Sequence, residues 1–291
     1  MRKLLVVNNP TSGGRRKNQK VMRELTTFLT ANKLESDIQQ TELNTNALKI
    51  IRNRLDDSFS DLIIVGGDGT INESVNALTH DIPMTIIPTG TGNDFVKNVK
   101  ICKTLQEQFE AIINGNIQTI DLGICNDRKF ANGVGIGFDG QIVEDMSSKT
   151  VPLLKGHAKY YYHVLQVLAS YKTRDFKFSV DDKPFERPLI IMTIGNGTTF
   201  GGGFKLMPNA KIDDGLLEVC TIGPLAPFRR FLNIHKLSNG THGSLETVHF
   251  HQAKTVRVQE NPFLFAHVDG ELMGNPPYDI KVLPNALKLR I

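Results

Sequence analysis

The feature that most constrains the fold is a regular alternation, over the first 125 residues, of short apolar runs with segments of helical periodicity. The predicted strands lie at 3–7, 36–41, 62–65, 84–87 and 117–122, of which 36–41 is mostly polar, and the helical patterns at about 18–32, 47–56, after Thr70 and at 105–114. Strands separated by helices of ~10–15 residues are typical of βαβ units, in which strands pair in parallel. We therefore predict a parallel α/β domain over residues 1–125.

After about residue 125 the pattern changes to closely spaced apolar runs punctuated by Gly, Pro and Asn. These runs lie at 130–134, 176–180, 189–194, 216–221, 255–259, 263–268 and 278–283. Such spacing favours antiparallel strands, so we predict an antiparallel β-sandwich domain over residues 126–283. A helical pattern at 153–169 interrupts it, and we interpret this segment as a helix packed on the sheet. The last residues, 286–291, alternate like a strand.

Three glycine-rich turns follow predicted strands of the first domain. They are Asn8-Asn9-Pro10-Thr11-Ser12-Gly13-Gly14, Gly66-Gly67-Asp68-Gly69-Thr70 and Thr89-Gly90-Thr91-Gly92-Asn93-Asp94. Glycine permits tight turns and a close approach of backbone N–H groups to a ligand, and a helix that begins after such a turn attracts anions. Because the carboxyl ends of parallel strands meet at one edge of a sheet, we expect the three turns to converge on a phosphate site.

Asp68 lies in the middle of the second turn, where its charge repels a phosphate unless a cation intervenes. We expect it to act through a metal ion or its waters, and the alternative is an Asx-turn that caps its own backbone. These turns contain neither G-x-x-x-x-G-K-[ST] nor a strand-linked G-x-G-x-x-G, which argues against a P-loop or a classical dinucleotide fold. The later run 133–140 is interpreted as backbone packing rather than direct ligand contact.

Composition excludes several other classes of protein. With 40% hydrophobic and 22% charged residues and a net charge of +4, the chain falls short of the basic stripe of a nucleic-acid binder. Cys102, Cys125 and Cys220 lack C-x-x-C spacing, which argues against a disulfide framework and a zinc site. No window approaches the ~18–20 apolar residues of a membrane span, and the first apolar run is too short for a signal peptide. We therefore expect a cytoplasmic protein whose contact with lipid is peripheral.

Five motifs, taken together, resemble the soluble bacterial diacylglycerol kinase family, the lipid kinases related to eukaryotic diacylglycerol and sphingosine kinases. They are Asn8-Asn9-Pro10 with Ser12-Gly13-Gly14, Gly66-Gly67-Asp68-Gly69-Thr70 with Asn72-Glu73, 89–94, 208–217 and Asp269-Gly270-Glu271. The resemblance covers nearly the whole chain, although GGDGT alone is shared with NAD kinases. It implies a Rossmann-like nucleotide domain, as in NAD kinases, made of 1–125 plus about 284–291. It also implies a β-rich domain at 126–283 that binds the lipid substrate and the magnesium ion.

The same resemblance implies individual site residues. The implied ATP-binding residues are Asn9, Pro10, Thr11, Ser12, Gly13, Thr41, Gly66, Gly67, Asp68, Gly69, Thr70, Asn72 and Thr91, of which Thr41 has no motif behind it. Magnesium is implied at the Asp214 side chain and the carbonyls of Lys211 and Leu216, with Asp68 and Asp94 joined through water. Glu271 is the implied general base, with Asp269 and Asp68 in the same catalytic set.

The expected function is an ATP- and Mg²⁺-dependent lipid kinase that acts on diacylglycerol or a related lipid in an interdomain cleft. Candidate lipid-facing residues are Phe138, Phe200, Phe204 and 160–162, and candidate headgroup contacts are 15–17, Arg229 and Arg230. The alternatives are an NAD kinase and a catalytically inactive, nucleotide-regulated lipid-binding protein. We expect peripheral contact with a membrane surface, no nucleic-acid partner and no transmembrane segment, and a homodimer is left open.

Overall fold

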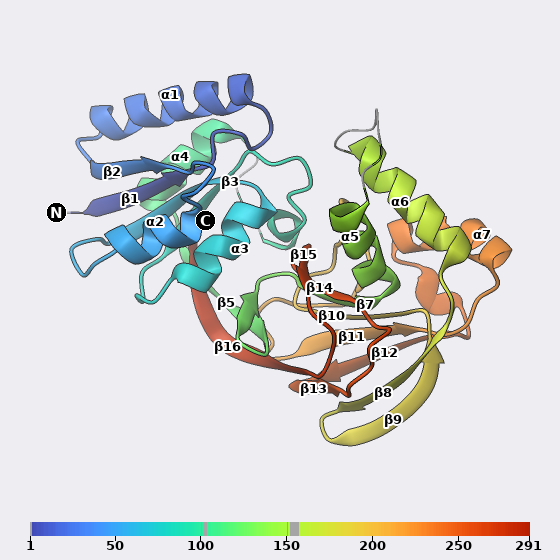
Figure 1. Ribbon diagram of the computed structural model, residues 1–291. Helices are drawn as coiled ribbons and strands as arrows, with labels where there is room; N and C mark the ends of the chain where they lie inside the picture. Colours follow the sequence, from blue (N-terminus) through green and yellow to red (C-terminus); the bar gives the residue numbers. More distant parts are fainter. Residues whose placement is uncertain (1, 100, 102–103, 150, 152–156) are drawn as a thin grey trace. The chain divides into compact units, whose positions relative to one another are not determined.

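The computed structural model describes residues 2–99, 101, 104–149, 151 and 157–291 (Figure 1). The chain forms two compact units. Unit 1 comprises Met1–Leu122 together with Pro284–Ile291, and unit 2 comprises Gly123–Leu283. Cys125 and Cys220 are free and buried, whereas Cys102 lies outside the described residues.

Unit 1 is built on parallel strands in the order β2-β1-β3-β4. Their bounds are β1 (Lys3–Asn8), β2 (Glu35–Gln40), β3 (Asp61–Gly66) and β4 (Met84–Pro88). Every neighbouring pair is parallel, with registers such as Val6 opposite Ile63. The predicted parallel α/β arrangement is confirmed, since four consecutive strands alternate with helices and run in one direction.

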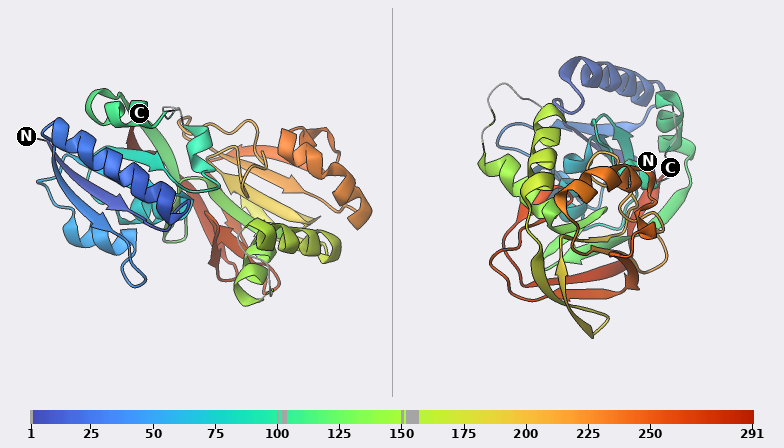
Figure 2. Two further views of the ribbon diagram at one scale, coloured as in Figure 1. Left: turned by 90° about the horizontal axis from the view of Figure 1, so that it is seen from above. Right: turned by 90° about the vertical axis from the view of Figure 1, so that its right-hand side faces the viewer.

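Helices cover both faces of this sheet: α1 (Arg15–Ala31) and α4 (Leu105–Asn114) one face, α2 (Ala47–Arg54) and α3 (Asp68–Ala77) the other (Figure 1). Figure 2 shows α1 running along its face. Leu25 and Leu29 of α1 pack there with Ile63 of the sheet. The helix α1 begins three residues before the predicted start, because Gly13 and Gly14 take positive φ and turn the chain into it at Arg15.

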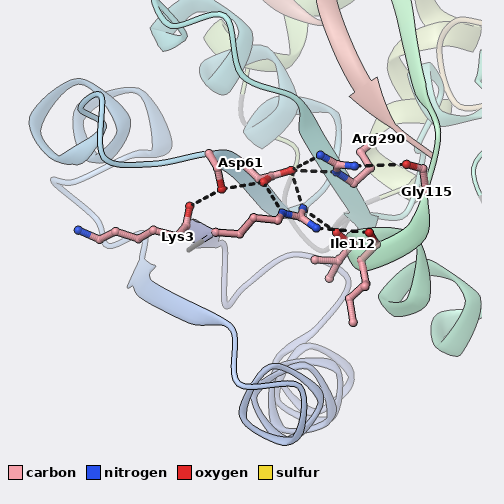
Figure 3. A network of polar contacts seen from close by, with 8 residues as sticks. Lys3, Asp61, Ile112, Gly115 and Arg290 are labelled. Atoms are coloured by element: carbon pink, nitrogen blue, oxygen red, sulfur yellow. Dashed lines mark hydrogen bonds and ion pairs between the residues drawn. The ribbon is translucent and has the colours of Figure 1, made fainter.

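The last strand, β16 (Tyr278–Arg290), ends in unit 1, where Leu289 pairs in parallel with Met84. A buried carboxylate holds it there (Figure 3). Asp61 is only 1% exposed and accepts hydrogen bonds from Arg290 Nε at 2.8 Å and from Arg2 Nε at 3.1 Å. Arg290 also donates to the Gly115 carbonyl, and Arg2 to the Ile112 carbonyl. One acid therefore joins the two ends of the chain within unit 1.

Unit 2 contains a six-stranded antiparallel sheet in the order β12-β11-β10-β7-β14-β15. Its strands are β7 (Gly133–Gly137), β10 (Ile191–Gly195), β11 (Leu217–Ile222), β12 (Val248–Ala253), β14 (Ala266–Val268) and β15 (Glu271–Met273). A second layer contains β8 (Arg174–Val180), β9 (Lys183–Leu189), β13 (Thr255–Val258) and the first part of β16, again antiparallel. One apolar core joins residues of both layers, such as Ile136 and Met192 with Phe176 and Val256. The predicted β-sandwich is confirmed.

Two predicted strands of this unit each turned out to be two. The run 130–134 divides into β6 (Arg128–Phe130), which pairs with the end of β5 (Ile117–Cys125), and β7. It divides because residues 131–133 turn their N–H groups toward the carboxylate of Asp269. The run 189–194 likewise divides into the end of β9 and the whole of β10.

Three helices lie on the outer face of the six-stranded sheet: α5 (Phe138–Ser148), α6 (His157–Ser170) and α7 (Pro227–Asn239) (Figure 1). The predicted helix at 153–169 corresponds to α6, and its first residues, 153–156, lie outside the described part of the chain. The sequence analysis missed α5 and α7. A signal for α7 was present, since Pro227 occupies its first turn and Gly240 its left-handed C-cap. Among the described residues, no helix is long and apolar enough to cross a membrane.

Candidate active site

The three glycine-rich turns of unit 1 are in direct contact. A Cβ atom placed on Gly13 would lie 1.7 Å from the carbonyl oxygen of Thr89, and one placed on Gly90 would lie 2.6 Å from the Cα atom of Gly67. Thr89 N–H donates to the Gly66 carbonyl at 2.9 Å. The convergence expected from the parallel strand order therefore occurs, and glycine is required where backbone meets backbone.

Asparagine side chains fix the first turn. Asn9 Nδ2 donates to Thr70 Oγ1 at 3.1 Å, and Asn9 Oδ1 accepts from both the N–H and the hydroxyl of Thr11. From α1, the buried Asn18 donates to Asn8 Oδ1 and to the Asn9 carbonyl. These bonds hold the backbone of the turn against the start of α3.

Thr41, which no motif supported, follows β2 at the same edge of the sheet, because its N–H donates to the Asn8 carbonyl at 2.8 Å. Thr91 is exposed in the third turn. Asn72 is buried in α3 and its Oδ1 accepts from Asn76 Nδ2 at 3.4 Å, so it supports the helix from inside. Their contact with a nucleotide stays a prediction.

Two helices begin at these turns, α1 after Gly14 and α3 after Gly67, and neither cap residue provides a capping side chain. The first N–H groups of a helix have no acceptor within the helix and carry partial positive charge. The exposed Arg15, Arg16 and Lys17 add full charges in the first turn of α1. This edge of unit 1 therefore favours the binding of a polyanion such as a nucleoside triphosphate.

Asp68 contacts the third turn, and Asp94 is the last residue of that turn. Asp68 Oδ1 accepts from the N–H of Phe95 at 3.2 Å, and a Cβ atom on Gly92 would lie 3.2 Å from Asp68 Oδ2. Asp94 Oδ1 accepts from Lys97 Nζ at 2.8 Å. The Asp68 carboxylate thus reaches a segment 27 residues further along the chain, which goes beyond the Asx-turn alternative.

In unit 2, the Asp269-Gly270-Glu271 turn joins β14 to β15, with Asp269 and Gly270 at positive φ. The Asp269 carboxylate accepts three backbone hydrogen bonds, from Ala131 at 2.9 Å, Asn132 at 3.1 Å and Gly133 at 2.8 Å. Asp269 therefore fixes this turn against the start of β7. The side chain of Glu271 is exposed and forms an ion pair with Arg128.

A carboxylate and an imidazole beside this turn were missed by the sequence analysis. His267 Nδ1 accepts from the N–H of Gly270 at 3.2 Å, and His267 Nε2 lies 3.8 Å from Asp139 Oδ2. Asp139 is in the first turn of α5, and its buried Oδ2 has no hydrogen-bond partner within the part of the chain that the structure describes. The available signal was an acid in a glycine run, which we had interpreted as backbone packing.

Behind the three helices of unit 2 lies an apolar cavity of about 90 Å³. Its walls include Phe138, Phe200, Phe204 and Tyr160, all of which the sequence analysis named. Its polar side chains are Asp139, Tyr160, Arg230, Asn233 and His242. Tyr161 and Tyr162, named with them, are exposed instead.

Two polar residues of the cavity use their side chains to bind backbone carbonyl groups of unit 2. Arg230, expected as a headgroup contact, is instead buried and donates to the carbonyls of Leu225, Leu168 and Tyr171. Burial lowers the pKa of the Arg230 guanidinium. Burial also lowers the pKa of His242, whose Nε2 lies 3.1 Å from the Leu206 carbonyl oxygen.

The predicted magnesium ligands lie in the turn that precedes β11. Lys211 and Asp214 are exposed, and Asp214 Oδ1 accepts from the N–H of Leu216 at 3.1 Å. The described residues contain no group of three or more His, Cys, Asp or Glu that could hold a metal ion. The predicted magnesium site would not form such a group, because it contains one carboxylate side chain and two main-chain carbonyls. Its hard oxygen donors fit Mg²⁺, which keeps several waters.

Comparison with known proteins shows a family for each part of the chain. Residues 3–125 match the diacylglycerol kinase catalytic domain, and residues 132–291 match the YegS C-terminal NAD kinase beta sandwich-like domain. A diacylglycerol kinase of Staphylococcus saprophyticus is 28% identical over 277 residues, which cover 94% of this chain and 90% of that protein. A Shewanella frigidimarina protein named "Probable lipid kinase YegS-like" is 27% identical over 258 residues, covering 87% of this chain and 83% of the relative.

Solved structures agree on the fold. A diacylglycerol kinase from Bacillus anthracis superimposes with a TM-score of 0.74 at 21% identity, over 99% of this chain and 96% of its own. An NAD kinase from Archaeoglobus fulgidus in complex with ATP gives a TM-score of 0.57 at 14% identity, over 99% and 93% of the two chains. With a matching catalytic-domain model, a matching C-terminal model and curated relatives along almost its full length, the chain belongs to the diacylglycerol kinase catalytic-domain family with a YegS-type C-terminal domain, a family of nucleotide-using lipid kinases.

Proposed function

We propose that the protein transfers the γ-phosphoryl group of ATP to the hydroxyl of diacylglycerol or a related lipid, with Mg²⁺. One observation carries the choice of acceptor: the apolar cavity of unit 2 has Asp139 in its lining, and Asp139 is linked through His267 to the turn that bears Glu271. An amphiphile with an acyl chain in the cavity would have its polar end beside these groups. A water-soluble acceptor has no use for such walls.

The donor half of the reaction belongs to unit 1 in this proposal. The N–H groups at the starts of α1 and α3, with the nearby basic residues 15–17, would bind the phosphates of ATP. The rigid contact between Gly13 and Thr89 would keep these groups in place. Positioning and charge stabilisation are the main protein contributions to phosphoryl transfer, so a stiff cradle serves both.

The acceptor half requires a base. Glu271 would take the proton of the lipid hydroxyl as the new O–P bond forms and the bond to the ADP leaving group breaks. Asp269 holds the turn through its three N–H bonds, and Arg128 orients the Glu271 carboxylate. Asp139 Oδ2, with its free lone pairs, would accept a hydrogen bond from the lipid head.

Magnesium, when bound, neutralises phosphate charge. Asp214 and the carbonyls of Lys211 and Leu216 would hold it, with Asp68 and Asp94 joined through its waters. Both units are then needed for turnover in this proposal.

The proposal is tested by incubating the protein with Mg²⁺, labelled ATP and mixed micelles of diacylglycerol, sphingoid base or prenol, with NAD as a parallel acceptor. We expect labelled lipid from the wild type and about a 1,000-fold lower rate for Glu271→Gln, since a positioned base contributes about 10²–10⁴-fold. Glu246→Gln, at an exposed glutamate of unit 2, is the matched control. Label in NAD but in no lipid would identify an NAD kinase, and no labelled product would favour an inactive lipid-binding protein.

A further inference from the structure

The helices α6 and α7 expose large apolar side chains that no described residue of their unit covers. On α7, Phe228, Phe231 and Leu232 are 72%, 41% and 55% exposed. On α6, Tyr161, Tyr162 and Leu165 are 52%, 42% and 52% exposed. Each trio follows three- and four-residue spacing and so occupies one face of its helix, and the two helices pack side by side. We call these six side chains the apolar ridge.

A second face of each of these helices lines the cavity. Tyr160, Val164 and Leu168 of α6 and Ile234 and Leu237 of α7 are among its walls. Each helix is therefore apolar on its inner face and on its outer face. The ridge and the cavity thus lie on two faces of the same pair of helices. This continuity connects the surface to the place where a lipid chain is proposed to bind.

The charge of the ridge indicates what covers it. Neither α6 nor α7 contains an Asp or Glu, whereas α7 carries Arg229, His235 and Lys236, and Arg229 is exposed among the ridge residues. Helices with aromatic and leucine side chains on one face and basic residues beside them are typical of helices that lie in a membrane interface. Anionic headgroups attract each nearby Lys or Arg. A second copy of the same surface would bring like charges together instead.

We propose that the apolar ridge docks unit 2 on an anionic lipid bilayer, so that a lipid passes from the membrane into the cavity along α6 and α7. The docking depends only on the ridge, whereas the passage of a substrate rests on the proposed function. Phe228, Phe231 and Leu232 would enter the headgroup region, and Arg229 would contact phosphate. Membrane contact and substrate capture would thus use two faces of the same helices.

The docking is tested by co-sedimentation with vesicles of phosphatidylcholine containing phosphatidylglycerol, without ATP or substrate. We expect the double variant Phe228→Ser with Leu232→Ser to bind about tenfold more weakly than wild type, because burial of each side chain contributes to interfacial affinity. Leu43→Ser with Phe263→Ser removes two exposed apolar side chains elsewhere and should bind like wild type. Far-ultraviolet circular dichroism confirms that both variants fold. Unchanged binding of the ridge variant would overturn the proposal.

Two further measurements separate this inference from its alternatives. The ridge variant should keep wild-type activity on a short-chain diacylglycerol dissolved as monomers and lose activity on vesicles. If neither protein phosphorylates any lipid while the ridge still controls vesicle binding, the proposed function fails and the docking stands. If the ridge substitutions convert a dimer to a monomer in sedimentation equilibrium and leave vesicle binding intact, a second copy covers the ridge and the docking is refuted.

Discussion

Gly13 and Thr89 lie so close that a Cβ atom on Gly13 would be 1.7 Å from the Thr89 carbonyl oxygen. The two residues are far apart in the sequence, and each follows a different parallel strand. Because the two backbones are in direct contact, the turns cannot move relative to each other without a change in the native structure. The proposed phosphate cradle is therefore held by the fold itself.

Gly13→Ala is expected to displace the first turn from the third and to reduce kcat/KM for ATP about 100-fold, since small misplacements near reacting groups cost this much. Gly14→Ala is the matched control, because Gly14 shares the positive φ but a Cβ atom there meets nothing within 4 Å. Steady-state kinetics with varied ATP measure both variants. Equal losses would mean that backbone strain, rather than the contact with Thr89, governs activity.

Asp61→Asn should destabilise unit 1 by about 3 kcal/mol, since breaking a buried ion pair leaves charged partners uncompensated. Both Arg2 and Arg290 lose the negative charge with which they pair in this variant. Urea unfolding followed by circular dichroism measures the change. Asp57→Asn, at a fully exposed acid, should unfold like wild type. A stable Asp61→Asn variant would show that the strand β16 is held in unit 1 by packing alone.

Asp269 and Glu271 are two residues apart, and their substitution should have different consequences. Asp269→Asn replaces one of the two carboxylate oxygens that accept three backbone hydrogen bonds. It is expected to lower the free energy of unfolding by about 2 kcal/mol, and also to lower activity. Glu271→Gln should lower kcat without a change in stability, because its side chain is exposed. Thermal unfolding and kinase rates on the same samples separate the roles. Loss of stability in Glu271→Gln would contradict this division.

The cavity should limit the length of chain that the enzyme accepts. Ile234→Trp adds bulk to its wall and is expected to reduce activity on long-chain diacylglycerol at least tenfold while a short-chain substrate is still phosphorylated. Ile117→Trp makes the same substitution at an exposed isoleucine of unit 1, away from the cavity and the membrane-facing helices, and is the matched control. The ratio of long-chain to short-chain kcat/KM is the measurement. An unchanged ratio for Ile234→Trp would place the acyl chain elsewhere.

Stability of unit 2 should depend on the protonation of His242. Burial depresses the folded pKa of His242, although its hydrogen bond to the Leu206 carbonyl opposes the shift. As pH falls below about 6.5, the unfolded chain binds a proton that the folded chain does not, so stability is lost toward the depressed folded pKa. Urea unfolding between pH 7.5 and 5.5 should show a smaller loss for His242→Asn than for wild type. An identical loss would be inconsistent with this assignment, and His249→Asn, at an exposed histidine, is the control.

Local patterns in the sequence predicted most elements but not all their limits. The parallel strands of unit 1 were clear, because fully buried strands appear as continuous apolar runs between helices. The helix α5 was missed because its sequence follows directly on a glycine-rich strand, where the backbone turns at Gly137 with a φ of 88°. The division of residues 130–134 depends on the carboxylate of Asp269, more than 130 residues away, and no local pattern contains that information.

The sequence by itself determined that the first domain has parallel strands, where its glycine-rich turns lie, and which family it resembles. These properties depend on periodicity and on short motifs at strand ends. Only the tertiary structure brought Asp139, His267 and the Glu271 turn together and showed that α6 and α7 are apolar on both faces. Contacts between distant segments arise from how strands and helices pack, so a one-dimensional pattern does not encode them locally. The glycine-rich turns proposed to bind the phosphate donor could therefore be predicted from the sequence. The proposed acceptor cavity and the membrane-facing helices became apparent only in the structure, because they depend on packing.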